Sequence, residues 1–124
     1  MQRVNEQQQK FRQGDHGPKY MFRYPEALRL AGAFCWLTGK QRTALKYWKE
    51  GLAIGKKLGL KPDLGRISFE VAKRLSSAES RYRTLEKLGP EHYARTAREI
   101  FTEFGLELDM EEVKAWEQGH HAQN

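Results

Sequence analysis

The segment between Pro25 and Gly59 constrains the fold more than any other part of the chain, because it has the pattern of two amphipathic helices joined by a short turn. It reads PEALRLAGAFCWLTGKQRTALKYWKEGLAIGKKLG. Apolar residues recur at the steps of three and four that mark one face of a helix, and Gly39 stands where the first helix must stop. Between them stand small residues, which let two helix backbones approach closely: Gly32, Ala44, Gly51 and Gly55. We therefore expect a tightly packed antiparallel hairpin.

The next amphipathic stripe begins at Leu64 and continues in register as far as Leu85. However, Ser76 followed three residues later by Glu79 has the form of a capping box, which would start a separate helix. We favour a break or kink at Ser76, and the pattern alone leaves open whether residues 62–88 form one helix or two.

Gly89 and Pro90 mark a further boundary, since glycine ends helices and proline begins them. The following helix is expected to end at Gly105. Asp109 with Glu112 forms another capping box and predicts a short final helix that covers the apolar end of the structure. The inward face of the helix before it is expected to hold Tyr93, Ala94, Ala97, Ile100, Phe101 and Phe104.

A short internal echo supports a repeated architecture. The sequence GLKPDL at residues 59–64 returns as GLELDM at residues 105–110, a spacing of 46 residues. Each copy is placed to end one helix and begin the next, as stacked helical hairpins require.

The first hairpin resembles a tetratricopeptide (TPR) repeat, a unit of 34 residues built from two helices. With Pro25 as the first position, the small, turn and aromatic positions of that pattern are filled by Gly32, Gly39, Ala44, Trp48 and Gly51. The resemblance extends loosely over residues 25–112. The longer second helix and its closing Leu-Gly are similar to TPR-type segments at the carboxyl ends of large bacterial signalling proteins, among them nucleotide cyclases and ATPases.

The resemblance and the pattern together predict an all-α domain over residues 25–118, a TPR-like stack of two antiparallel α-hairpins plus a short C-terminal capping helix. Residues 1–24 are expected to form a leader or linker, whose aromatic end from Tyr20 to Tyr24 folds back onto the first hairpin. Residues 119–124 are expected to be a frayed tail.

Charge is distributed unevenly along the chain, which has a net charge of +6. Residues 1–61 hold 13 Lys and Arg against 4 Asp and Glu, whereas residues 62–124 hold 9 against 12. Such asymmetry suggests an anionic partner or an acidic neighbour, and surface charge serving solubility alone is the equal alternative. The single cysteine, Cys35, and the absence of a signal-peptide core or an apolar run of membrane-spanning length predict a cytoplasmic protein.

The sequence offers no convincing catalytic or cofactor site. The stretch from Gly51 to Lys57 loosely resembles a phosphate-binding loop, but it has the wrong glycine spacing, lacks Ser or Thr after the lysine, and is helical. The histidines lack the spacing of a zinc site, and Cys35 in an apolar helix is better explained as a core residue than as a nucleophile. We expect no enzyme activity, no metal and no cofactor.

With no catalytic or cofactor site expected, the remaining function is recognition of a partner at the protein surface. In TPR stacks the first helix of each pair lines a concave groove, and the resemblance carries this role onto Glu26, Arg29, Ala33, Trp36, Arg66, Phe69, Lys73 and Arg74. An aromatic ring among several cations suits an acidic or carboxylate-bearing peptide. Trp36 could equally belong to the core.

We therefore expect a non-enzymatic protein-interaction module, which binds a partner peptide or regulates a larger signalling assembly. One alternative is a homo-oligomer in which another copy completes the helical stack. Another is a basic nucleic-acid-binding protein, which would use the cations on the outer face of the second helix, although a solvated surface explains them more simply. These cations are Arg42, Lys46, Lys49, Lys56 and Lys57. No membrane partner is expected.

Overall fold

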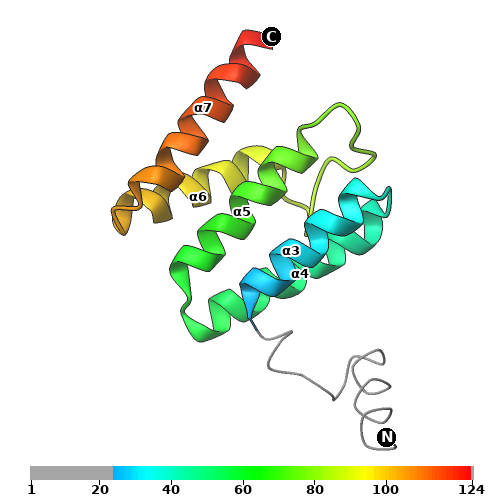
Figure 1. The fold of residues 1–124 in the computed structure, drawn as a ribbon, viewed down its shortest axis with the longest axis horizontal. Helices are drawn as coiled ribbons and strands as arrows, with labels where there is room; N and C mark the ends of the chain where they lie inside the picture. The colour runs from blue at the N-terminus through cyan, green and yellow to red at the C-terminus, as the bar shows by residue number, and fades with distance from the viewer. Residues whose placement is uncertain (1–23, 124) are drawn as a thin grey trace, which may run out of the picture.

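The computed structural model describes residues 24–123, which form five helices (Figure 1). These are α3 (Pro25–Leu37), α4 (Gln41–Leu58), α5 (Lys61–Leu75), α6 (Pro90–Glu103) and α7 (Glu107–Gln123). The described part of the chain contains no β-strand, only an isolated bridge between Leu85 and Leu88. The predicted all-α class is therefore confirmed. The predicted leader lies outside the described residues except for Tyr24.

Small residues set the contact between α3 and α4, as expected. A Cβ added to Gly32 would overlap the indole of Trp48, and one added to Gly51 would lie 2.7 Å from Ile67 Cδ1. The Trp48 side chain is fully buried, and its Nε1 donates a hydrogen bond to the carbonyl oxygen of Arg29 at 3.1 Å. The absence of side chains at the two glycines thus lets an indole and an isoleucine fill the space between helices.

Three glycines end helices with one shared geometry. Gly39, Gly59 and Gly105 have φ values of 87°, 70° and 63°, in the left-handed region that favours glycine. In each case the next residue donates its N–H to a carbonyl five residues earlier: Lys40 to Cys35 at 2.8 Å, Leu60 to Gly55 at 2.9 Å and Leu106 to Phe101 at 2.9 Å. The echo at Gly59 and Gly105 is therefore a repeated helix stop, and Gly39 is a third instance of it.

The helices pack as two neighbouring pairs followed by a final helix (Figure 1). α3 pairs with α4 and α5 with α6, while α5 also contacts α3 and α4 and so joins the two pairs. Gly65 on α5 allows close approach to α6, since a Cβ there would lie 2.8 Å from the ring of Phe101. The buried core runs through the joint between the pairs and includes Trp36, Trp48, Ile67, Val71, Leu85 and Tyr93.

Residues 76–89 form a loop, so a second helix starting at Ser76 is not observed. The Ser76 hydroxyl donates back to the carbonyl oxygen of Ala72 at 2.8 Å, which ends α5 instead of capping a new helix. Gln41 then holds the loop: its Nε2 donates to the carbonyl of Glu79, and its Oε1 accepts the N–H of Arg81, both at 2.9 Å. The Tyr93 hydroxyl fixes the far side by donating to the carbonyl of Leu85 at 2.7 Å.

The final helix differs from the expected one in both start and length. α7 begins at Glu107, two residues before the predicted cap Asp109, because the carbonyl of Leu106 already accepts the first helical N–H, that of Met110, at 2.9 Å. It continues to Gln123, past the position at which a frayed tail was expected to begin. Val113 is fully buried against α6 and the end of α5, so the helix does cover this end of the core.

Phe104, which was expected on an inward face, is exposed, and so is Leu58 at the corresponding place on α4. Leu58 and Phe104 lie at helix ends, beside Gly59 and Gly105, with 56% and 45% of their surface accessible. The chain turns away at these glycines, so the next helix does not extend over the last turn of the previous one.

Candidate partner-binding groove

A depression of about 510 Å³ lies between α3, α5 and the start of α7. In the chain these three helices alternate with α4 and α6. α3 and α5 are therefore each the first helix of a pair, and α7 follows the second pair. The lining, which we call the groove, consists of Glu26, Arg29, Asp63, Arg66, Phe69, Glu70, Lys73, Asp109 and Glu112.

The structure brings five of the eight residues proposed from the sequence into this groove: Glu26, Arg29, Arg66, Phe69 and Lys73. Trp36 is in the core instead, only 6% exposed, with its ring centroid 5.8 Å from that of Trp48. Ala33 lies half-buried on α3 outside the lining, and Arg74 lies beside Glu70 without lining the groove itself.

One wall of the groove is an ion pair within α3. Arg29 donates to Glu26 through Nε at 3.1 Å and Nη2 at 2.7 Å, a two-point contact. The hydrogen bond from Arg29 lowers the pKa of the Glu26 carboxyl, and the same bond raises the pKa of Arg29. Both groups therefore stay charged over the whole physiological pH range.

Glu70 forms the centre of the network, although the sequence did not single it out. Its side chain is only 7% exposed and has three cations around it. Arg74 Nε lies 2.9 Å from one carboxylate oxygen, and Lys73 Nζ and Arg29 Nη1 lie 3.8 and 3.9 Å from the other. A buried carboxylate is stable only with such compensation, so these cations are already engaged by the protein.

A second two-point pair connects α5 to α7. Arg66 donates through Nε and Nη2 to the two carboxylate oxygens of Asp109, both at 3.0 Å. The hydrogen bonds to Asp109 raise the pKa of Arg66. Sequence reasoning explained Asp109 only as a cap, yet the echo contained the signal: Asp63 and Asp109 occupy the same place in it, and both are the third residue of their helix.

The groove floor contains an aromatic contact. Phe69 is 6% exposed, and its ring meets Trp116 edge to face with centroids 5.8 Å apart. Lys73 Nζ lies 4.5 Å from the centre of the Phe69 ring. The ring thus positions Lys73 and closes the floor, while offering little free surface of its own.

Charge in the groove differs from the expectation. The lining holds five carboxylates and three cations, a formal net charge of −2. All three cations are paired with carboxylates of the protein, whereas among the described residues neither Asp63 nor Glu112 has an ion-pair partner within 4 Å, and Asp63 attracts Arg66 only from a longer distance. The available charge is therefore negative, which does not favour an acidic peptide.

The basic face of α4 is fully accessible. Arg42, Lys46, Lys49, Lys56 and Lys57 are all exposed. Among the described residues only Lys49 has an ion-pair partner, Glu86 at 3.3 Å, and both of these side chains are more than half exposed.

Fold and groove together define an all-α protein of paired antiparallel helices with a charged depression formed by alternate helices. Comparison with known proteins finds no matching family model, curated protein or solved structure. Within residues 24–123, no cluster of three or more His, Cys, Asp or Glu could hold a metal ion. None of the described helices combines the length and the apolar character needed to cross a membrane.

Proposed function

We propose that this chain is a TPR-like hairpin stack that acts as a non-enzymatic interaction module and binds a segment of a partner protein in the groove. The observation that carries the proposal is that one depression is lined by every second helix of the chain, namely α3, α5 and α7. TPR stacks present their ligand surface in this way, and the residues of the first hairpin resemble that family. The same resemblance favours a partner within a larger signalling assembly.

The charges of the groove indicate the chemistry of that segment. Asp63 and Glu112 offer unpaired carboxylates, so Lys or Arg side chains of a partner would gain charge-assisted hydrogen bonds there. The paired cations offer no comparable gain to an acidic peptide, because binding one would require an existing ion pair to open. A peptide with basic side chains is therefore the better fit.

Selection from random peptides displayed on phage tests this proposal. We expect enriched sequences rich in Lys and Arg, and at least about tenfold weaker binding to an Asp63→Lys, Glu112→Lys double variant, as loss of close charge pairs predicts. An Arg42→Glu, Lys46→Glu variant, altered on the basic face of α4, serves as the control and should bind like the unaltered protein. Enrichment of acidic peptides, or equal binding by the groove variant, would contradict the proposal.

The exposed cations of α4 favour nucleic-acid binding as a second candidate function. Five cations along one helix can follow a phosphate backbone, and such binding weakens steeply with salt. A labelled duplex and a labelled single strand, measured by fluorescence polarisation across a salt series, test this. Binding should fall in a Lys46→Glu, Lys56→Glu variant, and absence of binding at low salt would remove the candidate.

A further inference from the structure

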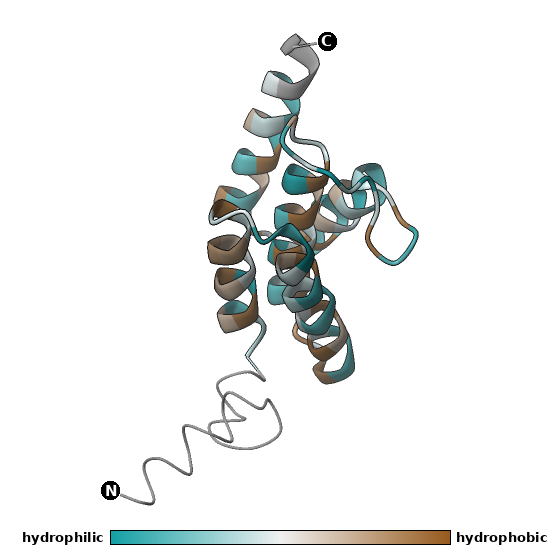
Figure 2. Ribbon diagram, turned by 90° about the vertical axis from the view of Figure 1, so that its right-hand side faces the viewer, coloured by the Kyte–Doolittle hydropathy of each residue, from teal (hydrophilic) through white to brown (hydrophobic). Residues whose placement is uncertain are grey.

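The outward side of α3 is apolar and exposed. Leu30, Phe34 and Leu37 have 53%, 68% and 72% of their surface accessible, and they lie on one side of the helix at steps of four and three residues. We call this surface, with the half-buried Ala27 and Ala31 beside it, the α3 face. Figure 2 shows α3, the helix reached from the grey trace, largely in the colours of apolar residues. A continuous apolar surface of this kind is often an interaction site.

From Leu30 to Leu37 the α3 face carries no charge that would oppose association. From Leu30 to Thr38 the helix has no ionisable residue except Cys35. The two charged residues of α3, Glu26 and Arg29, are paired with each other in the groove. Large side chains alternate with alanines, so the face offers both protrusions and hollows to an identical face.

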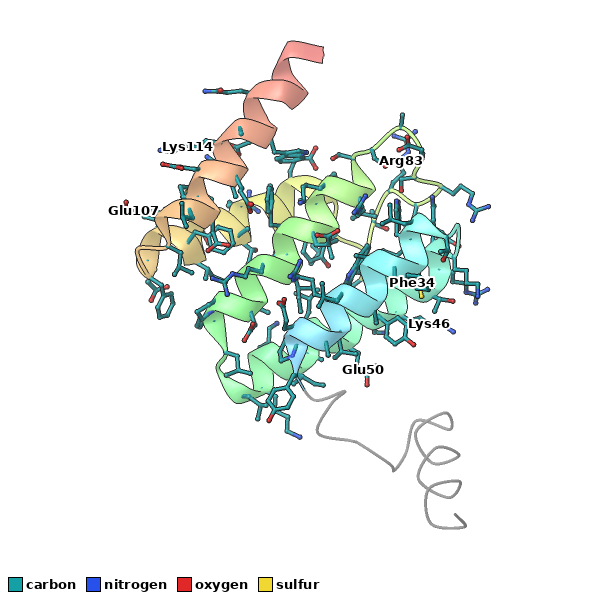
Figure 3. The ribbon with its side chains drawn as sticks, in the orientation of Figure 1. Phe34, Lys46, Glu50, Arg83, Glu107 and Lys114 are labelled. Carbon is teal, nitrogen blue, oxygen red and sulfur yellow. The ribbon has the colours of Figure 1, made fainter. Side chains whose placement is uncertain are left out.

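At the opposite end of the stack α7 covers the core, although Phe104 and Leu108 beside it remain exposed. Val113 of α7 is fully buried, and Phe101 of α6 beneath it is 1% exposed. Figure 3 shows the separation: Phe34, Lys46 and Glu50 lie on the first hairpin, whereas Glu107 and Lys114 lie on α7 at the other end of the molecule. The three large exposed side chains of α3 therefore form a surface at the end of the stack away from α7, where two identical faces can meet.

The size of the face suits a dimer. Leu30, Phe34 and Leu37 together present on the order of 400 Å² per copy, given their exposed fractions and roughly 200 Å² for a large side chain. Two copies would bury about 800 Å² through these three residues, and the flanking alanines and the exposed Tyr24 at the start of α3 can bring the contact to the roughly 1,000 Å² of a specific interface.

We propose that the α3 face is the contact between two copies of this chain, arranged antiparallel about a two-fold axis. Leu30, Phe34 and Leu37 belong neither to the groove lining nor to the basic face of α4. The proposal is therefore independent of the partner-peptide function, and each can fail without the other.

Light scattering coupled to size-exclusion chromatography of the full chain, over a concentration series up to the millimolar range, tests the dimer. We expect a dimer whose dissociation constant rises at least about 30-fold in Phe34→Glu, as for a central apolar contact. Leu37→Lys is a second variant, and both side chains are so exposed that the monomer should keep its helical circular dichroism. The matched control is Leu108→Glu, at an 80% exposed leucine on α7, which should leave the dimer unchanged.

Two results would overturn the proposal. A strict monomer over the whole series would show that the α3 face is covered by something other than a second copy, such as the chain's own N-terminal residues or a different protein. A dimer that persists in both Phe34→Glu and Leu37→Lys would place the contact elsewhere on the surface.

Discussion

The contact between Gly32 and Trp48 shows how one missing side chain determines the distance between two helices. The indole occupies the volume that a Cβ at position 32 would need, and it is held there by its hydrogen bond to the Arg29 carbonyl. Neither partner can move without opening the core, because Trp48 is completely buried. Any side chain at position 32 would therefore overlap Trp48, however strongly the substituted residue favours a helix.

Replacing Gly32 by alanine should destabilise the protein by about 2–4 kcal/mol, because the methyl group overpacks the core and disturbs the indole hydrogen bond. Chemical denaturation monitored by circular dichroism would measure the change. Gly119→Ala is the matched control, since nothing lies within 4 Å of a Cβ there. That variant should be unchanged or up to about 1 kcal/mol more stable, because alanine favours the helix. Equal stability of the two variants would refute the role of Gly32.

Helices were predictable wherever an apolar period ended at a glycine. The stops at Gly39, Gly59 and Gly105 use only local backbone geometry, so the sequence alone located them. The loop at 76–89 was not predictable in the same way. A serine at this position can either cap a new helix or hydrogen-bond to the helix before it, and Ser76 does the second. The loop that follows is held by Gln41, which lies 38 positions from its hydrogen-bond partner Glu79 in the sequence.

The loop gives a prediction for Gln41, which is only 7% exposed. Gln41→Ala removes two part-buried hydrogen bonds that hold the loop, so a loss of about 1–3 kcal/mol is expected. Amide hydrogen exchange should accelerate most at Arg81, whose N–H the glutamine accepts. Gln118→Ala, on the exposed surface of α7, is the control and should change neither quantity. Unchanged exchange at Arg81 would argue against this role.

The pair of Arg66 and Asp109 should determine how firmly α7 is held. A double-mutant cycle of Arg66→Gln and Asp109→Asn is expected to give a coupling energy of about 1 kcal/mol, since the pair has ideal two-point geometry but is partly exposed. Faster hydrogen exchange confined to α7 should accompany either single change. A coupling near zero would mean that Val113 and its neighbours hold the helix unaided.

The groove was predictable only in part, for a physical reason. Its cations lie on the helices that the TPR resemblance assigns to the concave side, and that assignment located Arg29, Arg66 and Lys73. Their carboxylate partners come from other turns and other helices: Asp109 is 43 residues from Arg66. A pattern read along the chain shows charges but not their pairing, so the cations that suggested an acidic ligand could not be recognised from the sequence as already paired.

At the scale of the molecule, α5 is the element on which the fold depends. It contacts α3, α4, α6 and α7, and it contributes to both buried clusters through Ile67 and Phe69. Stacks whose units touch only their neighbours can unfold in parts. Here one helix is shared by both pairs, so neither pair keeps its core when α5 is lost.

Unfolding should accordingly be a single transition. We expect the same denaturant midpoint from circular dichroism, which reports all helices, and from the fluorescence of Trp36 and Trp48 in a Trp116→Phe variant, which reports the first pair. Separate midpoints for the two signals would show that the pairs are independent.

The repeated stop has one further consequence. α7 follows Gly105 just as α5 follows Gly59, with an aspartate at its third position. The same local backbone device therefore restarts the chain twice, and it delivers a carboxylate to the same depression both times, since Asp63 and Asp109 both belong to its lining.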